Sequence, residues 1–253
     1  ICFMRADYTP SYIAFLDILG FKMFVKNHGF IQIREIFEHI GLDEKLVSGS
    51  MIRSEKEDQR LRRYNQALKQ CKIRIMSDSI VIAAPSRYEE SLAVVMDLCN
   101  NIQGSLYECE VPVFLRGAIA EGEFYCSSQV MFGQGLIDAY LAQENISVFP
   151  RIIIADKVLD KGVLFVDDLG GYGYEGLPQD KDGYHYINTL GNWLLLANCG
   201  IPIRDGVKYK KLYQYINSVL SDYSENKLRQ KYLWLQSELE RAADTAERAR
   251  TNI

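Results

Sequence analysis

The most informative part of this 253-residue chain is the stretch YIAFLDILGF, residues 12–21. It is almost entirely apolar and ends at Gly20 and Phe21, which predicts a short buried strand over residues 12–19. Asp17 nevertheless places a carboxylate inside this strand, and an unpaired buried carboxylate is costly. Two explanations stay open from this stretch alone. Either backbone N–H groups or an arginine satisfy Asp17, or Asp17 binds a metal ion.

A second aspartate occurs in a similar setting. The stretch CKIRIMSDSIVIAA, residues 71–84, predicts two short strands joined by a polar turn that contains Asp78. In an antiparallel sheet, the end of one strand and a neighbouring hairpin turn can lie side by side, and two carboxylates that meet there repel each other. A pair of divalent ions relieves this repulsion and supports in-line attack at phosphorus. Mg²⁺ suits such a site because it needs only one or two carboxylates beside the substrate phosphates.

The residues that follow Asp17 predict a place for phosphate. Gly20, Phe21 and Lys22 lie where the predicted strand turns into a helix. The free N–H groups at the start of a helix point outward and attract anions. We therefore expect a triphosphate to rest against the backbone of these three residues.

The remaining pattern predicts an α+β chain, with an antiparallel sheet and flanking helices. The expected elements are a helix over 22–40, a charged surface stretch over 53–63, a helix over 87–108, a strand over 112–125, a helix over 136–146 and a strand over 151–155. Residues 156–206 are rich in loops. From about residue 207 the chain is helical, so we expect a catalytic domain over 1–206 and a C-terminal helical extension over 207–253.

Composition and charge exclude several classes of protein. The formal net charge is -4 and the chain has six cysteines without a CxxC pair and three histidines, so neither a basic nucleic-acid-binding face nor a zinc site is expected. The cysteines lie mostly in apolar stretches, typical of buried thiols in a reducing compartment. No apolar run is long enough to span a bilayer. We expect a cytoplasmic protein.

Four stretches, in this order, resemble the catalytic domain of class III nucleotidyl cyclases. They are FLDILGF (15–21), RIMSDSI (74–80), RGAIAEG (116–122) and GLIDAYLAQE (135–144). Together they span roughly residues 12–155. The exact residues of these motifs are closer still to those of the bacterial pyrimidine cyclases of the Pycsar anti-phage systems. The motifs are FLDILGFK, SDSI, RGAI and GLIDAY…PRI.

This resemblance implies a class III cyclase-like fold, with a ferredoxin-like palm. It implies that UTP, in preference to CTP, is converted to the 3′,5′-cyclic monophosphate and pyrophosphate. Asp17, Asp78 and the carbonyl of Ile18 would hold two Mg²⁺ or Mn²⁺ ions. A homodimer would form both active sites at its interface, and the cyclic product would activate a separate effector protein in anti-phage defence.

Two further residues receive roles from the same resemblance. Arg74 occupies the position at which adenylate cyclases carry a purine-reading lysine, and each subunit would give it to the partner's site. A guanidinium offers a flat fork of donors for carbonyl oxygens, which uracil, cytosine and guanine all present. Tyr140, on the helix that would face the partner, either frames the base or packs in the dimer.

The chain also departs from the class III pattern. The family helix carries an Asn and, one turn later, an Arg that stabilise the transition state; here the corresponding positions are Ile137 or Asp138 and Leu141 or Ala142. Arg116 or Arg151 is a candidate replacement. Three alternatives therefore stay open: a non-catalytic, cyclase-like nucleotide-binding or regulatory module, a purine nucleotide cyclase, and an unrelated palm-type phosphotransferase.

Overall fold

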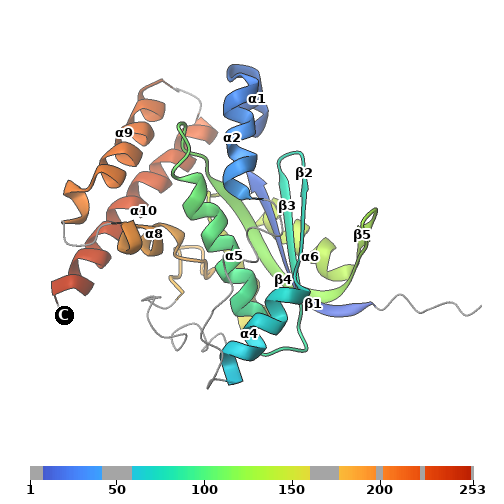
Figure 1. Cartoon of the computed structure of the whole chain (residues 1–253). Coiled ribbons are helices and arrows are strands. Elements are labelled where there is room, and N and C mark those ends of the chain that lie inside the picture. Colours follow the sequence, from blue (N-terminus) through green and yellow to red (C-terminus); the bar gives the residue numbers. More distant parts are fainter. Residues whose placement is uncertain (1–7, 42–58, 160–176, 198–201, 223–225, 252–253) are drawn as a thin grey trace, which may run out of the picture.

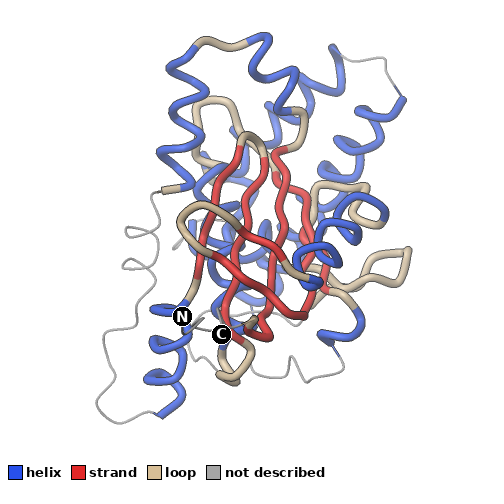
Figure 2. Tube along the Cα trace, turned by 90° about the vertical axis from the view of Figure 1, so that its right-hand side faces the viewer, coloured by secondary structure: helices blue, strands red, loops and turns tan. Residues whose placement is uncertain are grey.

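The computed structural model describes residues 8–41, 59–159, 177–197, 202–222 and 226–251. A curled sheet forms its centre, with the strand order β2-β3-β1-β4-β5 and with β6 beside β4 (Figures 1 and 2). The strands are β1 Thr9–Ile18, β2 Lys72–Met76, β3 Ser79–Pro85, β4 Leu115–Cys126, β5 Met131–Phe132 and β6 Ile152–Ile154. All pairs along the ordered path are antiparallel, and β6 runs parallel to β4.

The first four strands have the topology of a ferredoxin-like sheet. Helices connect β1 to β2, a tight turn joins β2 to β3, and α5 connects β3 to β4, so that β1 and β3 occupy the centre. This is the split βαβ arrangement, in which a hairpin strand inserts between two strands joined by a helix. The predicted α+β class, with an antiparallel sheet and flanking helices, is confirmed.

Helices cover both faces of the sheet. Their bounds are α1 Phe21–Asn27, α2 Phe30–Ile40, α4 Gln59–Gln70, α5 Ser91–Leu106, α6 Gln134–Asn145, α7 Asp156–Leu159, α8 Thr189–Ala197, α9 Val207–Asp222 and α10 Asn226–Thr251, with a short 3₁₀ helix at Ile203–Asp205. In Figure 1, α5 and α6 lie on opposite sides of the sheet. Helices α8, α9 and α10 lie together at the left of that view.

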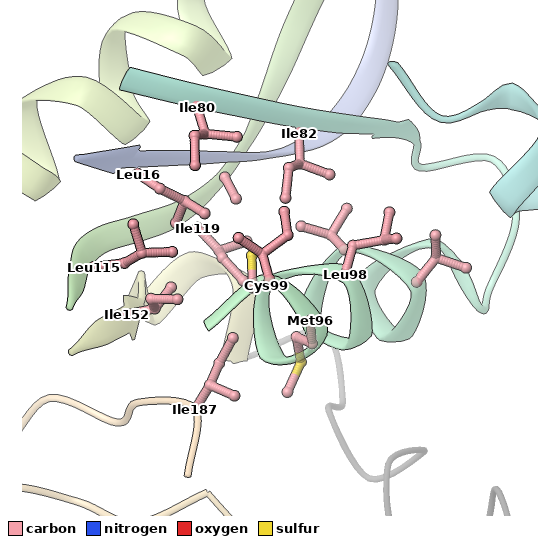
Figure 3. Packing of buried hydrophobic residues seen from close by; sticks show 14 of the residues in the cluster. Leu16, Ile80, Ile82, Met96, Leu98, Cys99, Leu115, Ile119, Ile152 and Ile187 are labelled. Carbon is pink, nitrogen blue, oxygen red and sulfur yellow. The ribbon is translucent and has the colours of Figure 1, made fainter. Parts of the chain in front are cut away.

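The alternation of β1 explains the two-sided cover. Leu16 and its even-numbered neighbours belong to the main core, where they meet Ile80 of β3 and Cys99 of α5 (Figure 3). Ile13 and Phe15 point to the other face, where Ala139 of α6 packs. Successive residues of a strand point to opposite faces, so a wholly apolar strand fits only a sheet that is covered on both sides. Asp17 therefore lies on the face that carries α6.

The C-terminal helices build a second core of their own. Tyr209 and Leu212 of α9 pack with Leu235 and Leu239 of α10, and Trp193 of α8 joins them. The boundary that we expect at 206/207 stays a prediction. Among the described residues, no helix is both long and apolar enough to cross a membrane.

The structure differs from the expected elements in a few places. The helix expected over 22–40 is two helices, because His28 has extended backbone angles and Gly29, also extended, is the N-cap of the next helix. Part of the loop-rich region contains α7 and α8, while 160–176 and 198–201 lie outside the described residues. The charged stretch 53–63 lies outside them up to residue 58 and then enters α4, whose Tyr64 is buried.

Candidate active site

The end of β1 and the turn between β2 and β3 lie directly beside each other. In the register of β1 and β3, Asp17 is opposite Ser79, the residue after Asp78. The N–H of Ile18 donates to the carbonyl of Asp78 at 2.9 Å. The turn itself contains Ser77 at φ 57°, a left-handed conformation. The two aspartates, which are far apart in the sequence, thus occupy one end of the sheet.

Asp17 has a direct partner on the neighbouring strand. Arg116 of β4 is opposite Asp17 in register, and its Nε donates to Asp17 Oδ2 at 2.7 Å. Only 18% of the Asp17 side chain is exposed. Burial raises the pKa of Asp17, the hydrogen bond and charge of Arg116 lower it, and Asp78 raises it further. The net direction is upward, so burial and the neighbouring acids outweigh the arginine.

Two more charged residues face this site, and neither was singled out from the sequence. Glu144 of α6 lies 3.9 Å from Arg116 and also raises the pKa of Asp17. Lys231 of α10 interacts electrostatically with Arg116, Asp17 and Glu144. The local sequence around each residue is typical of a polar helix surface and does not indicate a site. Only the packing of α6 and α10 brings the two residues to the end of β1.

The expected phosphate-binding backbone forms a tight turn into α1. Gly20 has φ 73°, and its carbonyl accepts the N–H groups of Met23 and Phe24. The left-handed backbone at this position favours glycine. Phe21 packs against the main core, whereas Lys22 is exposed. The turn follows Asp17 by three residues, so its backbone belongs to the same end of the sheet.

Arg74 and Tyr140, the two residues expected to contact the base, lie on different elements. Arg74 lies on β2, where its guanidinium donates to the carbonyls of Ile73, at 2.7 Å, and Ser127, at 3.3 Å. Tyr140 stands on α6 with its ring edge-on to Phe15 at 5.3 Å, on the same sheet face as Asp17.

Of the two candidate replacement arginines, only Arg116 lies in the site. Arg151 is almost fully buried and forms ion pairs with Asp180 and Asp182, which give it a structural role in this region. On α6, Asp138 accepts a hydrogen bond from Gln134, and Leu141 points into solvent. The helix therefore offers no amide and guanidinium at the positions where the class III pattern has them.

The donor set at the end of β1 fits a hard divalent ion. Asp17 and Asp78 provide carboxylate oxygens, and Ile18, whose N–H binds the Asp78 carbonyl, adds a backbone carbonyl oxygen. Oxygen ligands of this kind suit Mg²⁺ and Mn²⁺. Burial first, and then the charges of Asp78 and Glu144, raise the pKa of Asp17, so a bound cation would offset a cost that Arg116 only partly offsets.

No protein-family model and no curated protein matches this chain. Similar solved structures include the monomeric guanylyl cyclase domain of the RhoGC fusion protein from the aquatic fungus Blastocladiella emersonii, with a TM-score of 0.48, 10% identity, and coverage of 71% of this chain and 95% of that chain. The guanylate cyclase domain of RhGC from Catenaria anguillulae, in complex with GTP, has a TM-score of 0.42, 12% identity, and coverage of 71% and 94%.

A bacterial light-regulated adenylyl cyclase is also similar, with a TM-score of 0.38, 10% identity, and coverage of 60% of this chain and 45% of that chain. The structural neighbours are thus guanylyl and adenylyl cyclase domains. The fold described above rests on the strand order and register of the chain itself.

Proposed function

We propose that this chain is a nucleotidyl cyclase that converts UTP, in preference to CTP, to the 3′,5′-cyclic monophosphate and pyrophosphate. The observation that carries the proposal is the meeting of Asp17 and Asp78 at one end of the sheet, where the Ile18 N–H binds the Asp78 carbonyl. Paired carboxylates on neighbouring strands are a usual support for two divalent ions in phosphoryl transfer. The motif order along the chain adds the resemblance to class III cyclases.

The residues of this chain would divide the work as follows. Asp17, Asp78 and the Ile18 carbonyl hold two Mg²⁺ or Mn²⁺ ions, which lower the pKa of the ribose 3′-hydroxyl and neutralise charge on the triphosphate. The backbone of Gly20, Phe21 and Lys22 orients the phosphates. Catalysis then consists mainly of positioning the 3′ oxygen in line with the α-phosphate and of stabilising the charge that develops there.

We further propose that two subunits complete each site. Ile137, Tyr140 and Leu141 form an exposed apolar strip on α6, with spacings of three and four residues. A strip of this kind on a helix fits a protein partner better than solvent. In a homodimer, each subunit would provide its aspartates to one site, and Arg74 and Tyr140 to the site of the partner, where Arg74 reads the pyrimidine carbonyls.

A role in anti-phage signalling, with a separate effector that binds the cyclic nucleotide, follows from the resemblance to the Pycsar cyclases. It belongs to the proposal as a whole. No nucleic acid and no membrane takes part in it. Its chemical basis is tested first, because a signalling role needs a diffusible product.

A second candidate function is a cyclase-like module that binds nucleotide without catalysis. The ion pair between Asp17 and Arg116, at 2.7 Å, favours it, because the carboxylate already has a cationic partner. The positions at Asp138 and Leu141 favour it as well, because they lack the family's transition-state groups. The presence of both aspartates speaks against it.

The deciding experiment is a product assay on the purified chain. ATP, GTP, CTP and UTP are incubated separately with protein and Mn²⁺, and the products are identified by mass spectrometry. We expect cyclic UMP, or cyclic CMP in smaller amount, and a loss of roughly 100-fold or more in rate for Asp17→Asn and for Asp78→Asn. A cyclic purine nucleotide as product would contradict the proposed pyrimidine specificity and support a purine nucleotide cyclase. Nucleotide binding without any cyclic product would support the non-catalytic module.

A further inference from the structure

Helix α10 brings a lysine to the candidate active site through well-defined packing. Tyr232 of α10 contacts the ring of Phe114 at 5.9 Å, and the Phe114 carbonyl accepts the N–H of Leu19 at 2.8 Å. Leu19 and Phe114 lie two residues from Asp17 and Arg116 in the sequence, and both pack against the second core. Lys231, which precedes Tyr232, is therefore held next to the end of β1.

The helix position is also anchored on its other side. Trp234, three residues after Lys231, stacks on Phe149 with ring centroids 5.7 Å apart and donates to Asp180 at 2.8 Å. A half-buried lysine between two such aromatic anchors has restricted freedom. Because the backbone of α10 is fixed at this point, less entropy is lost when Lys231 binds a ligand than for a lysine on a mobile segment.

The charges around Lys231 leave its ammonium group available. Burial, together with the charges of Arg116 and, most weakly, Lys227, lowers the pKa of Lys231, whereas Asp17 and Glu144 raise it. Yet in the part of the chain that the structure describes, Lys231 forms no hydrogen bond or ion pair with either carboxylate. A lysine that served only as the counter-ion of Asp17 or Glu144 would contact one of them, as Arg116 does.

We propose that Lys231 is a substrate-binding residue that contacts the phosphate chain of the nucleotide from within the same subunit. The inference rests on the proposed function, and it supplies a cation that α6 lacks at Leu141. Lysine binds phosphate as a compact point charge and needs no fork geometry. The C-terminal helices thereby become part of the active site in addition to their packing role.

Inorganic triphosphate is the probe that separates this inference from the choice of base. Its binding to the full chain in the presence of Mn²⁺ is measured by calorimetry for the wild type, for Lys231→Met and for Lys227→Met. Lys227 lies one turn earlier on α10 and is exposed, so its replacement removes the same charge from the same helix. Methionine keeps the apolar stem of the lysine, and thermal unfolding of each variant checks that it is folded.

We expect Lys231→Met to weaken triphosphate binding by about tenfold or more, in keeping with the loss of a charge-assisted contact. Lys227→Met should change it by less than about threefold, in keeping with a screened surface charge. Lys231→Arg should retain part of the affinity. In the cyclase assay, Lys231→Met should raise KM for the nucleoside triphosphate. If Lys231→Met does not fold, Lys231→Gln takes its place.

The two proposals fail in different ways. Triphosphate binding that depends on Lys231, without a cyclic product from any nucleotide, would retain this inference and overturn the cyclase. Cyclic product formation with unchanged triphosphate affinity in Lys231→Met would overturn this inference and retain the cyclase. Equal weakening by the Lys231 and Lys227 variants would also overturn it, because a general charge effect would explain the result. A wild type that does not bind triphosphate would overturn it as well.

Discussion

At the scale of single residues, the form of Asp17 that would bind a metal ion is the form that lowers the stability of the metal-free fold. It lies on a buried strand beside Asp78 and Glu144, and its pKa is raised above the ordinary value of 3.8 despite the hydrogen bond from Arg116. A raised carboxyl pKa means that the folded protein binds a proton more tightly than the unfolded chain does. Ionising Asp17, which metal binding needs, therefore costs more free energy in the folded metal-free protein than in the unfolded chain.

The first prediction concerns Asp17→Asn in metal-free protein. Stability that comes from the protonated Asp17 is fully present below pH 3.8 and is lost as the pH rises through the higher folded pKa. Asparagine carries no charge at any of these pH values, so the variant should not lose that stability. We expect its Tm to exceed that of the wild type at pH 7, with roughly 2–4 °C for each kcal/mol, and the difference to shrink toward pH 4.

Thermal unfolding in the presence of a chelator, from pH 4 to pH 7, measures this difference. Asp222→Asn is the matched control, because Asp222 is exposed at the end of α9 and its replacement should leave Tm nearly unchanged. A lower Tm for Asp17→Asn at pH 7 would show that the ion pair with Arg116 outweighs burial. Added Mn²⁺ should stabilise the wild type but not the variant.

At the scale of elements, α6 lies unusually close to β4, where two glycines face each other. A Cβ at Gly122 would stand 2.7 Å from the Cα of Gly135, and a Cβ at Gly135 would stand 2.9 Å from the Cα of Gly122. These distances are below those of real side-chain contacts, and the opposing atoms are backbone. The close approach sets the height of α6 above the sheet, and with it the positions of Tyr140 and Glu144.

The second prediction is that Gly122→Ala destabilises the chain by about 1–3 kcal/mol, because it forces α6 away from β4. Gly104→Ala is the control with the opposite sign. Gly104 lies inside α5, where an added Cβ would meet the Trp193 side chain at an ordinary 3.6 Å. Alanine there should stabilise by about 0.5–1 kcal/mol. Urea unfolding monitored by circular dichroism compares the two, and equal behaviour would contradict the close-packing argument.

At the same scale, local sequence patterns predict a hairpin better than they predict the bounds of a helix. The helix expected over 22–40 has continuous apolar periodicity, but Gly29 and the extended His28 divide it, because capping depends on a few local backbone groups. The hairpin around Asp78 was predicted well, because a polar turn between two apolar strands is a strong local signal.

At the scale of the whole molecule, we propose that two copies of the chain share each active site. Arg74 lies on the edge strand β2, where it donates to the carbonyls of Ile73 and Ser127. The exposed strip on α6 would be covered in a dimer. A symmetric dimer would then contain two composite sites, each with aspartates from one subunit and Arg74 from the other.

The third prediction uses complementation between two inactive variants. Asp17→Asn and Arg74→Ala should each abolish cyclase activity when alone. Mixed in equal amounts with subunit exchange, half of the dimers are heterodimers, and each has one site with both intact contributions. We therefore expect recovery of about a quarter of the wild-type rate. Sites contained within one chain would give no recovery, and that result would contradict the shared site.

A variant of the interface provides the control. Leu141→Glu places a charge in the exposed strip of α6 and should give a monomer by analytical ultracentrifugation, because a buried unpaired charge is costly. Leu141 is half exposed in the single chain, so the fold should persist. The mixture should lose its recovered activity when both partners also carry this change.

The α+β class, the order of the main strands and the positions of the two aspartates on them followed from the sequence itself, because apolar periodicity, turn residues and an acid inside an apolar strand are local signals. Tertiary structure alone decided that Arg116 binds Asp17, that Arg151 is used for packing, and that Glu144 and Lys231 reach the end of β1. Those residues lie on different elements with ordinary polar surroundings. Their juxtaposition depends on how α6 and α10 pack on the sheet, which no short stretch of sequence contains.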